Sequence, residues 1–131
     1  MFLQPTYPTL PTKNFKYSFI VCITNMLEEN IKRIRNSAEI VYKTNDYTSA
    51  TILYFKTLFA ILDLIILKSK GKTPKDHTER FRILKSSFPE LYTIIDKYFK
   101  IYRDTYVTTI EKEDCDKIRK NVKELIEKYK I

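Results

Sequence analysis

Apolar residues recur at helical spacing over two long stretches of the chain. From about Asn25 to Lys43, and again from about Glu111 to Tyr129, they lie three or four residues apart, so each set falls on one face of a helix. The first stripe consists of Leu27, Ile31, Ile34, Ala38 and Val41; the second consists of Cys115, Ile118, Val122, Leu125 and Tyr129. Both patterns predict amphipathic helices that turn one face to a core.

The start of the first of these helices has two possible positions. Asn25 can cap it, and Glu28, three residues on, matches a capping-box partner. Residues 14–24 are also expected to be helical, either as an upstream extension or as a separate segment. Residues 1–12 have prolines at positions 5, 8 and 11, which favours an extended arm.

The central segment is the most apolar part of the chain. After the polar turn Thr44-Asn45-Asp46, a helix is expected to run to about Lys70, with almost no polar face in its second half. A soluble protein places such a helix at its centre or packs part of it against a second subunit. Lys56 and Asp63 interrupt the apolar run, which argues against a membrane span.

Glycine and proline punctuate the rest of the pattern. Gly71 suits the left-handed position after a helix end, and Thr73-Pro74 predicts the cap and first turn of a short helix reaching about Ser86. Pro89 is expected to begin another helix that ends at Arg103-Asp104. Its predicted buried face contains Leu91, Ile94, Ile95, Tyr98, Ile101, Tyr102 and Thr105.

Composition narrows the fold class. A chain of 131 residues fits one domain, here expected over 13–131, and a single glycine is too few for the tight turns of an all-β fold. The pattern predicts an all-α protein. We expect an up-down-up-down bundle of four main helices and an additional short one.

Positive charge is concentrated in one segment. Of the net charge of +8, the stretch from Lys68 to Lys85 holds +5, with seven basic residues against two acidic ones. The basic residues are Lys68, Lys70, Lys72, Lys75, Arg80, Arg82 and Lys85. Such a patch attracts polyanions such as RNA, although charge runs also serve simply as solvated surface.

The cysteines and the N-terminal apolar run carry little further information. Cys22 and Cys115 lie far apart without a metal-binding spacing, so reduced thiols in a cytoplasmic protein are expected, with no metal and no cofactor. The apolar run from Tyr17 to Ile23 is too short to cross a bilayer. Abundant Lys and Ile with a single Gln hint at a thermophilic source.

Three features together resemble the HEPN domains. They are the pair Tyr54-Phe55, the turn that holds Lys70, Gly71, Pro74 and His77, and the helix that ends in Arg103. The chain is similar to this family over about residues 31–126. The resemblance implies a small prokaryotic helical bundle, often encoded beside a minimal nucleotidyltransferase in toxin–antitoxin or defence pairs.

The resemblance breaks at the catalytic motif. Active HEPN ribonucleases carry an Arg followed closely by a His, which implies a phosphate-binding role for Arg103. Thr108 and Thr109 stand where the His would fall, and a threonine hydroxyl has no useful pKa. This departure argues against the family's usual cleavage chemistry. The alternatives left open are an active ribonuclease that combines Arg103 with His77 or a hydroxyl, and a purely structural dimeric adaptor.

The expected binding residues lie on the basic segment and on the helix ending in Arg103. Tyr98, Tyr102 and Tyr106 share one helical face and could stack on bases or pack in a core or dimer interface. We expect the protein to be a homodimer that binds RNA, a nucleotide or a partner nucleotidyltransferase. The candidate residues are Lys70, Lys72, Lys75, Arg80, Arg82, Lys100, Arg103 and Tyr106, with His77, the one histidine, as a weak catalytic candidate.

Overall fold

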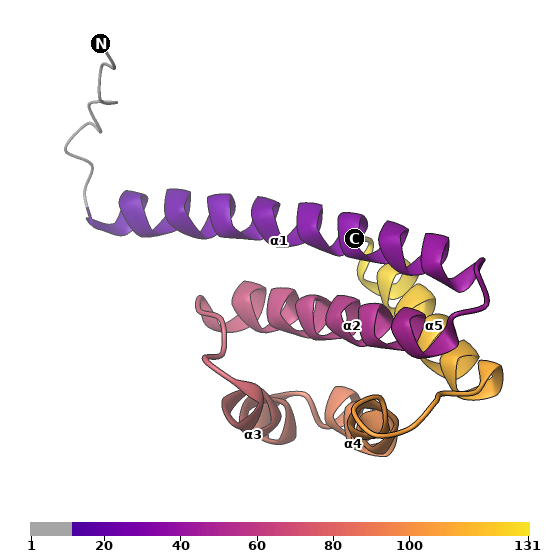
Figure 1. Cartoon of the computed structure of the whole chain (residues 1–131). Helices are drawn as coiled ribbons and strands as arrows, with labels where there is room; N and C mark the ends of the chain where they lie inside the picture. Colours follow the sequence, from indigo (N-terminus) through magenta and orange to yellow (C-terminus); the bar gives the residue numbers. More distant parts are fainter. Residues whose placement is uncertain (1–11) are drawn as a thin grey trace, which may run out of the picture.

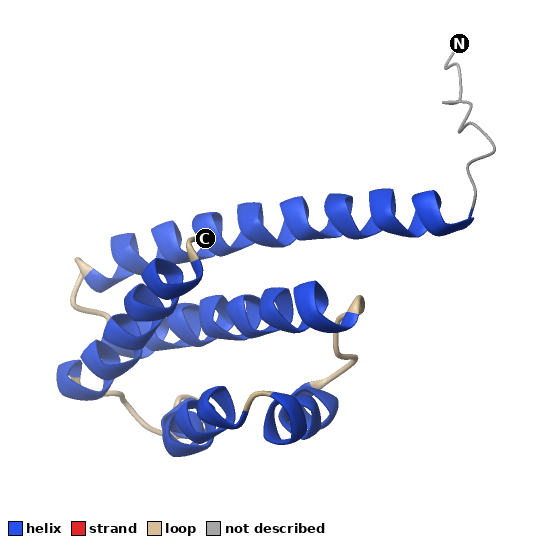
Figure 2. Cartoon of the chain, turned by 180° about the vertical axis from the view of Figure 1, so that it is seen from behind, coloured by secondary structure: helices blue, strands red, loops and turns tan. Residues whose placement is uncertain are grey.

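The described part of the chain, residues 12–131, consists of five α-helices and contains no strand (Figures 1 and 2). The structure is a computed structural model, and it describes side chains from Tyr17 onward. The helices are α1 (Thr12–Tyr42), α2 (Tyr47–Lys70), α3 (His77–Ser87), α4 (Pro89–Asp104) and α5 (Lys112–Tyr129). The all-α prediction is confirmed. Most of the predicted 1–12 arm lies outside the described residues, and Thr12 already belongs to α1.

Helix α2 lies at the centre of the molecule. It packs antiparallel to α1 on one side, contacts α3 and α4 on the other, and is also covered by α5 (Figure 1). In both overall views α3 and α4 are seen nearly end-on, so they run across α2 rather than beside it. The predicted up-down-up-down arrangement therefore describes the α1–α2 hairpin, but it does not describe α3 and α4.

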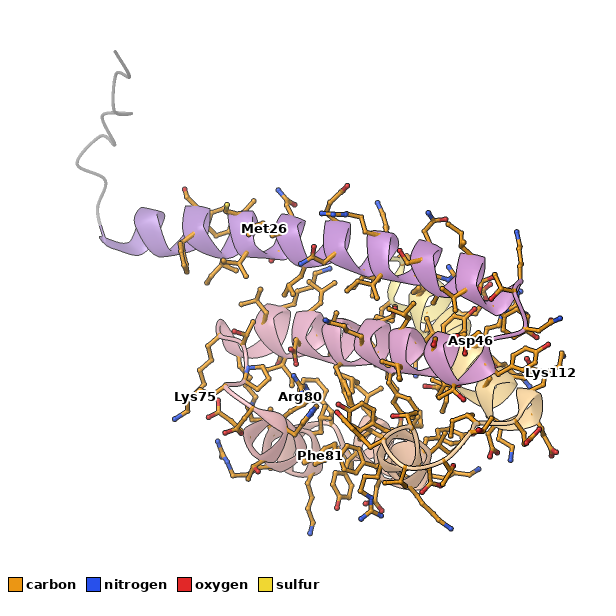
Figure 3. All side chains as sticks on the ribbon, in the orientation of Figure 1. Met26, Asp46, Lys75, Arg80, Phe81 and Lys112 are labelled. Atoms are coloured by element: carbon orange, nitrogen blue, oxygen red, sulfur yellow. The ribbon has the colours of Figure 1, made fainter. Side chains whose placement is uncertain are left out.

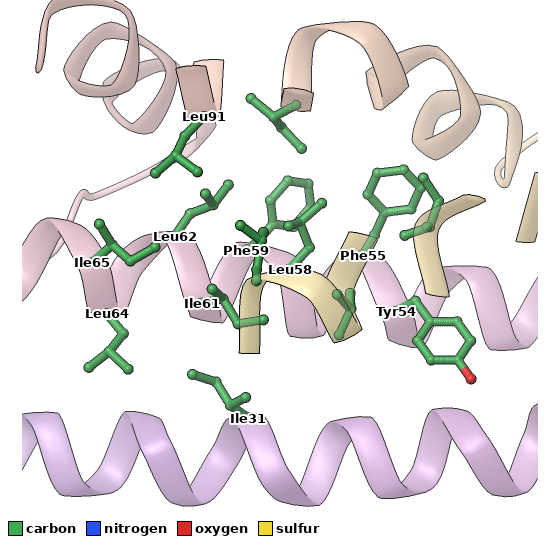
Figure 4. Packing of buried hydrophobic residues seen from close by; sticks show 14 of the residues in the cluster. Ile31, Tyr54, Phe55, Leu58, Phe59, Ile61, Leu62, Leu64, Ile65 and Leu91 are labelled. Carbon is green, nitrogen blue, oxygen red and sulfur yellow. The ribbon is translucent and has the colours of Figure 1, made fainter. Parts of the chain in front are cut away.

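The core forms around the apolar surface of α2 (Figure 4). Tyr54, Phe55, Ile61 and Ile66 are fully buried, and Ile31 of α1 packs against them. Each such side chain contributes about 1.5–3 kcal/mol of transfer free energy on burial. The chain itself covers α2, so the apolar excess of this helix does not require a second subunit. By length and hydropathy α2 could also cross a membrane, but 72% of its apolar window is buried inside the protein.

Local capping explains most of the helix boundaries. Asp46 caps α2 by accepting a hydrogen bond from the Ser49 amide at 3.0 Å. Gly71 ends that helix with φ +76°, and its N–H donates to Leu67 O at 2.8 Å. Pro89 occupies the first turn of α4, as predicted.

Two predicted starts are wrong. Asn25 caps nothing, because α1 is continuous from Thr12 to Tyr42 and places it mid-helix; the extension over 14–24 is confirmed. Helix α3 begins at His77 rather than at Thr73-Pro74. Asp76 caps it by accepting from the Glu79 amide at 2.9 Å, since its carboxylate supplies a stronger acceptor three residues before an acidic residue.

Candidate functional site

A buried ion pair joins α2 to α3. Arg80 Nε donates to Asp63 Oδ1 at 2.7 Å and Nη2 donates to Oδ2 at 3.0 Å, while the two side chains are only 10% and 18% exposed. We predicted Arg80 as part of the exposed basic surface; the structure places it between the helices instead (Figure 3). The reason is Asp63, a carboxylate within an apolar helix, which needs a cationic partner to be buried.

His77 lies directly against this pair. Its Nδ1 is 2.6 Å from Nη1 of Arg80, and because a guanidinium only donates, Nδ1 accepts and the ring proton is on Nε2. Burial and the charge of Arg80 lower the pKa of His77 below its ordinary value of 6.5, so the ring is neutral at pH 7. Four aromatic rings surround it at centroid distances of 4.6 to 6.3 Å. They belong to Phe59, Phe81, Phe99 and Tyr102.

Arg103 borders the same aromatic cluster from outside. It is exposed, and its guanidinium carbon lies 5.9 Å from the centroid of Phe99, a ring that also lies 6.0 Å from His77. The two residues predicted as catalytic candidates thus both lie near one ring, Phe99. Thr108 and Thr109, in the register of the family's His, are exposed after α4.

The remaining predicted cations are on the surface. Lys70, Lys72 and Lys75 lie in or beside the exposed α2–α3 connection, and Figure 3 shows Lys75 pointing away from the helices. Arg82 on α3 and Lys100 on α4 are exposed as well. These residues keep their charges in water, in contrast to Arg80.

Exposed cations and aromatic rings alternate along α3 and α4. Lys85 Nζ lies 5.7 Å from the Tyr92 ring centroid, and Lys97 Nζ lies 5.3 Å from that of Tyr98. With Arg103 over Phe99, three aromatic rings have a cation above them. We call this region the α3–α4 surface. It consists of Arg82, Lys85, Lys97, Lys100, Arg103 and Tyr106.

The three tyrosines predicted on one face of α4 have different surroundings. Tyr106 is 74% exposed, and its hydroxyl is 2.9 Å from that of Tyr102. Tyr102 is half-buried and packs on Phe55 and Phe59; the hydrogen bond to Tyr106 and burial raise its pKa. Tyr98 is also half-buried. Only Tyr106 offers most of its ring to a ligand.

A second guanidinium–carboxylate pair was not predicted. Arg119 of α5 donates through Nε and Nη2 to Glu39 of α1 at 2.9 and 2.8 Å, and the Tyr54 hydroxyl donates to the same carboxylate. The hydrogen bonds from Arg119 dominate in lowering the pKa of Glu39 to about 2. The two partners are 80 residues apart, so no local spacing could have indicated them.

Potential metal ligands are scattered in the described part of the chain. Over these residues, no three His, Cys, Asp or Glu side chains gather in a way that could hold a metal ion. The two thiols are also separate: Cys22 is exposed and Cys115 is buried.

Comparison with known proteins gives no relative on which to rest an assignment. No family model, no curated protein sequence and no solved structure matches this chain.

Proposed function

We propose that this protein is a noncatalytic RNA-binding protein that uses the α3–α4 surface, within a HEPN-like arrangement of its helices. The observation that carries the proposal is the row of exposed cations placed over aromatic rings, next to the exposed ring of Tyr106. Cations bind phosphates, and the exposed ring of Tyr106 can stack on an unpaired base, so this combination favours single-stranded RNA over duplex RNA.

The absence of a histidine next to Arg103 in the chain supports a noncatalytic role. Metal-independent RNA cleavage needs a group that accepts the 2′-hydroxyl proton or protonates the leaving oxygen. Among the described residues the one histidine, His77, uses Nδ1 to accept from Arg80 and lies among aromatic rings. Threonine hydroxyls at 108 and 109 cannot replace it.

The test is a gel in which binding and cleavage are read together. Wild type and Arg103→Ala are each mixed with structured and with single-stranded RNA, in EDTA, at low and moderate salt. We expect intact, retarded single-stranded RNA with wild type and weaker retardation with the variant. Cleavage by wild type, or the absence of any retardation at low salt, would contradict the proposal.

Tyr106 gives a second handle on the same surface. Loss of a stacked base costs about 1–3 kcal/mol, so Tyr106→Ala is expected to weaken RNA binding by roughly five- to 150-fold. Tyr106→Phe keeps the ring and serves as the matched control, with binding close to wild type. Equal losses in the two variants would show that stacking is not what Tyr106 contributes.

A ribonuclease is the second candidate function, because the His77 ring and the Arg103 guanidinium lie 6.0 and 5.9 Å from the centroid of the same ring, Phe99. In that case EDTA-resistant cleavage is expected, and either Arg103→Ala or His77→Ala would abolish it. Cleavage that survives both substitutions would point to a contaminating nuclease.

We further propose a homodimer that forms through the first half of α1. Tyr17, Phe19, Val21 and Met26 are 42–72% exposed, and no charged residue lies between Tyr17 and Asn25. Since each chain carries a net charge of +8, two copies repel least where an exposed segment has no cation. A hollow of about 300 Å³ beside this segment, lined by Phe19, Ile20 and Ile23 and on its α2–α3 side by Lys72, can receive apolar side chains of the partner helix.

The oligomeric state tests the dimer directly. Sedimentation of wild type is expected to give a dimer, and Phe19→Asp is expected to give a monomer with unchanged helix content. Ile52→Asp, at another exposed apolar position, is the matched control and should remain dimeric. A monomeric wild type, or a dimer that tolerates Phe19→Asp, would exclude this interface.

A partner nucleotidyltransferase and a cytoplasmic toxin–antitoxin or defence role remain parts of the proposal drawn from the resemblance.

A further inference from the structure

A polar hollow separates the second half of α1 from the first two-thirds of α5. Its volume is about 510 Å³, within the usual range for sites that take small molecules. Helix α1 contributes Arg35, Glu39 and Tyr42, which lie at spacings of four and three and so share one face. The hollow is distinct from the α3–α4 surface, which lies on the other side of α2 (Figure 1).

Helix α5 supplies most of the charge. Its lining residues also share one face and consist of four cations and one acid. They are Lys112, Asp116, Arg119, Lys120 and Lys123. With Arg35 and Glu39 from α1, the hollow holds five cations and two carboxylates, a net charge of +3.

Two of the cations and both acids form a fixed frame. Arg119 is held by Glu39, and its guanidinium carbon lies 4.2 Å from the centroid of the Tyr42 ring. Lys112 Nζ donates to Asp116 Oδ2 at 3.0 Å, and the Tyr42 hydroxyl donates to Asp116 Oδ1 at 2.5 Å. These bonds neutralise both carboxylates and connect the two helices through Tyr42.

The other three cations provide the surplus charge. Arg35 and Lys123 have no carboxylate oxygen within 4.0 Å in the described part of the chain, and the nearest to Lys120 Nζ is Glu124 Oε1 at 3.9 Å. A frame of paired groups, beside two cations without a carboxylate partner and a third whose partner is 3.9 Å away, is suited to a compact ligand of several negative charges.

We propose that this hollow is a binding site for the polyphosphate group of a small molecule, with Arg35, Lys120 and Lys123 as its phosphate-binding residues. A chain of two or three phosphates matches the surplus of three positive charges and can present an oxygen to each cation. Among the described residues, Tyr42 is the one aromatic residue that lines the hollow, and Arg119 covers one face of its ring, so no exposed ring like that of Tyr106 is offered to a base. This feature distinguishes it from the α3–α4 surface.

The experiment is a calorimetric titration of the full chain with inorganic tripolyphosphate at low salt. We expect saturable binding with about one ligand per chain, weakened as salt is added. Arg35→Gln/Lys123→Gln is expected to weaken it about tenfold or more, because two charge-assisted contacts to phosphate are lost. Lys97→Gln/Lys100→Gln on α4 removes the same charge elsewhere and should change binding less than about twofold.

Three results would overturn the proposal: no binding by wild type, equal losses in the two double variants, or a loss of RNA affinity in Arg35→Gln/Lys123→Gln as large as its loss for tripolyphosphate. The last would make the hollow part of an RNA-binding surface. Circular dichroism of each variant shows whether the helices are intact; neither Arg35 nor Lys123 belongs to the frame. A failure of RNA binding at the α3–α4 surface would leave this result unaffected.

Discussion

Arg80 and Arg103 reach the same aromatic cluster from different helices, yet they have different surroundings. Arg80 is 8% exposed, bound at two points to Asp63 and packed over Phe59, whereas Arg103 is exposed and rests on the outer ring, Phe99. The difference depends on whether a carboxylate lies within the core. An arginine that pairs with a carboxylate in the core has a structural role. An arginine without such a partner can bind an anionic ligand.

The largest loss of stability is expected on substitution of Arg80. Arg80→Ala leaves the Asp63 carboxylate, whose side chain is 18% exposed, unpaired, which should cost up to about 3–5 kcal/mol of unfolding free energy. Arg103→Ala should change that free energy by less than about 0.5 kcal/mol. Urea unfolding followed by circular dichroism measures both. Replacing both partners, in Asp63→Leu/Arg80→Leu, should cost less than Arg80→Ala alone; a greater cost would contradict the explanation.

Arg119 and Glu39 sharpen the comparison as an intermediate case, because their side chains are 41% and 30% exposed. Glu39→Gln is expected to lower the unfolding free energy by about 1–2 kcal/mol at pH 7, since water partly replaces the lost interaction. The pKa of Glu39 is lowered from 4.5 to about 2 in the fold. Its contribution is therefore complete above about pH 4.5 and is lost as the pH falls toward 2.

Urea midpoints of wild type and Glu39→Gln, measured from pH 7 to pH 2, check this window. The two curves should be parallel above about pH 4.5 and converge below it. Curves that stay parallel down to pH 2 would mean that the carboxylate does not depend on Arg119. Lys120→Gln, which removes a nearby cation outside the pair, is the control.

The smallest effect is expected at His77, which contacts Arg80 and lies in the aromatic cluster that Arg103 borders. Its pKa is lowered in the folded state by burial and by Arg80, so the unfolded chain takes up this proton first as the pH falls. Stability linked to His77 is therefore present above pH 6.5 and declines below it. His77→Gln should remove that part of the decline in stability between pH 7 and pH 5. The urea midpoint of the variant should therefore depend less on pH than that of wild type. An unchanged slope would place His77 in water.

Sequence reasoning located the helices well where local chemistry fixes them. The stripes of α1 and α5, the left-handed Gly71 and Pro89 at the start of α4 all depend on near neighbours in the chain. The predicted starts of α1 and α3 were wrong because Asn25 and Thr73 are residue types that can cap a helix, but so are residues at other positions nearby. Local patterns rank such sites poorly.

The candidate site was predictable only in part, for a different reason. Lys100 and Arg103 are exposed on α4, where helical spacing placed them; Tyr106 follows the end of α4, and its exposure could not be told from the spacing, which also fitted packing in a core. Arg80 was misplaced because its partner Asp63 lies on another helix, 17 residues away. The hollow between α1 and α5 was missed entirely, since its two faces meet only when the chain folds.

The most direct test of RNA binding at the α3–α4 surface is a fluorescence-anisotropy titration of single-stranded RNA across a range of salt concentrations. Lys100→Gln/Arg103→Gln is compared with Lys32→Gln/Arg33→Gln, which removes two exposed cations from α1 instead. Each lost phosphate contact reduces the salt slope by about 0.7, so the first variant should bind less tightly and flatten the slope by about 1.4. The second should match wild type. Equal losses in the two variants would show that RNA responds only to net charge and would contradict a defined site on α4.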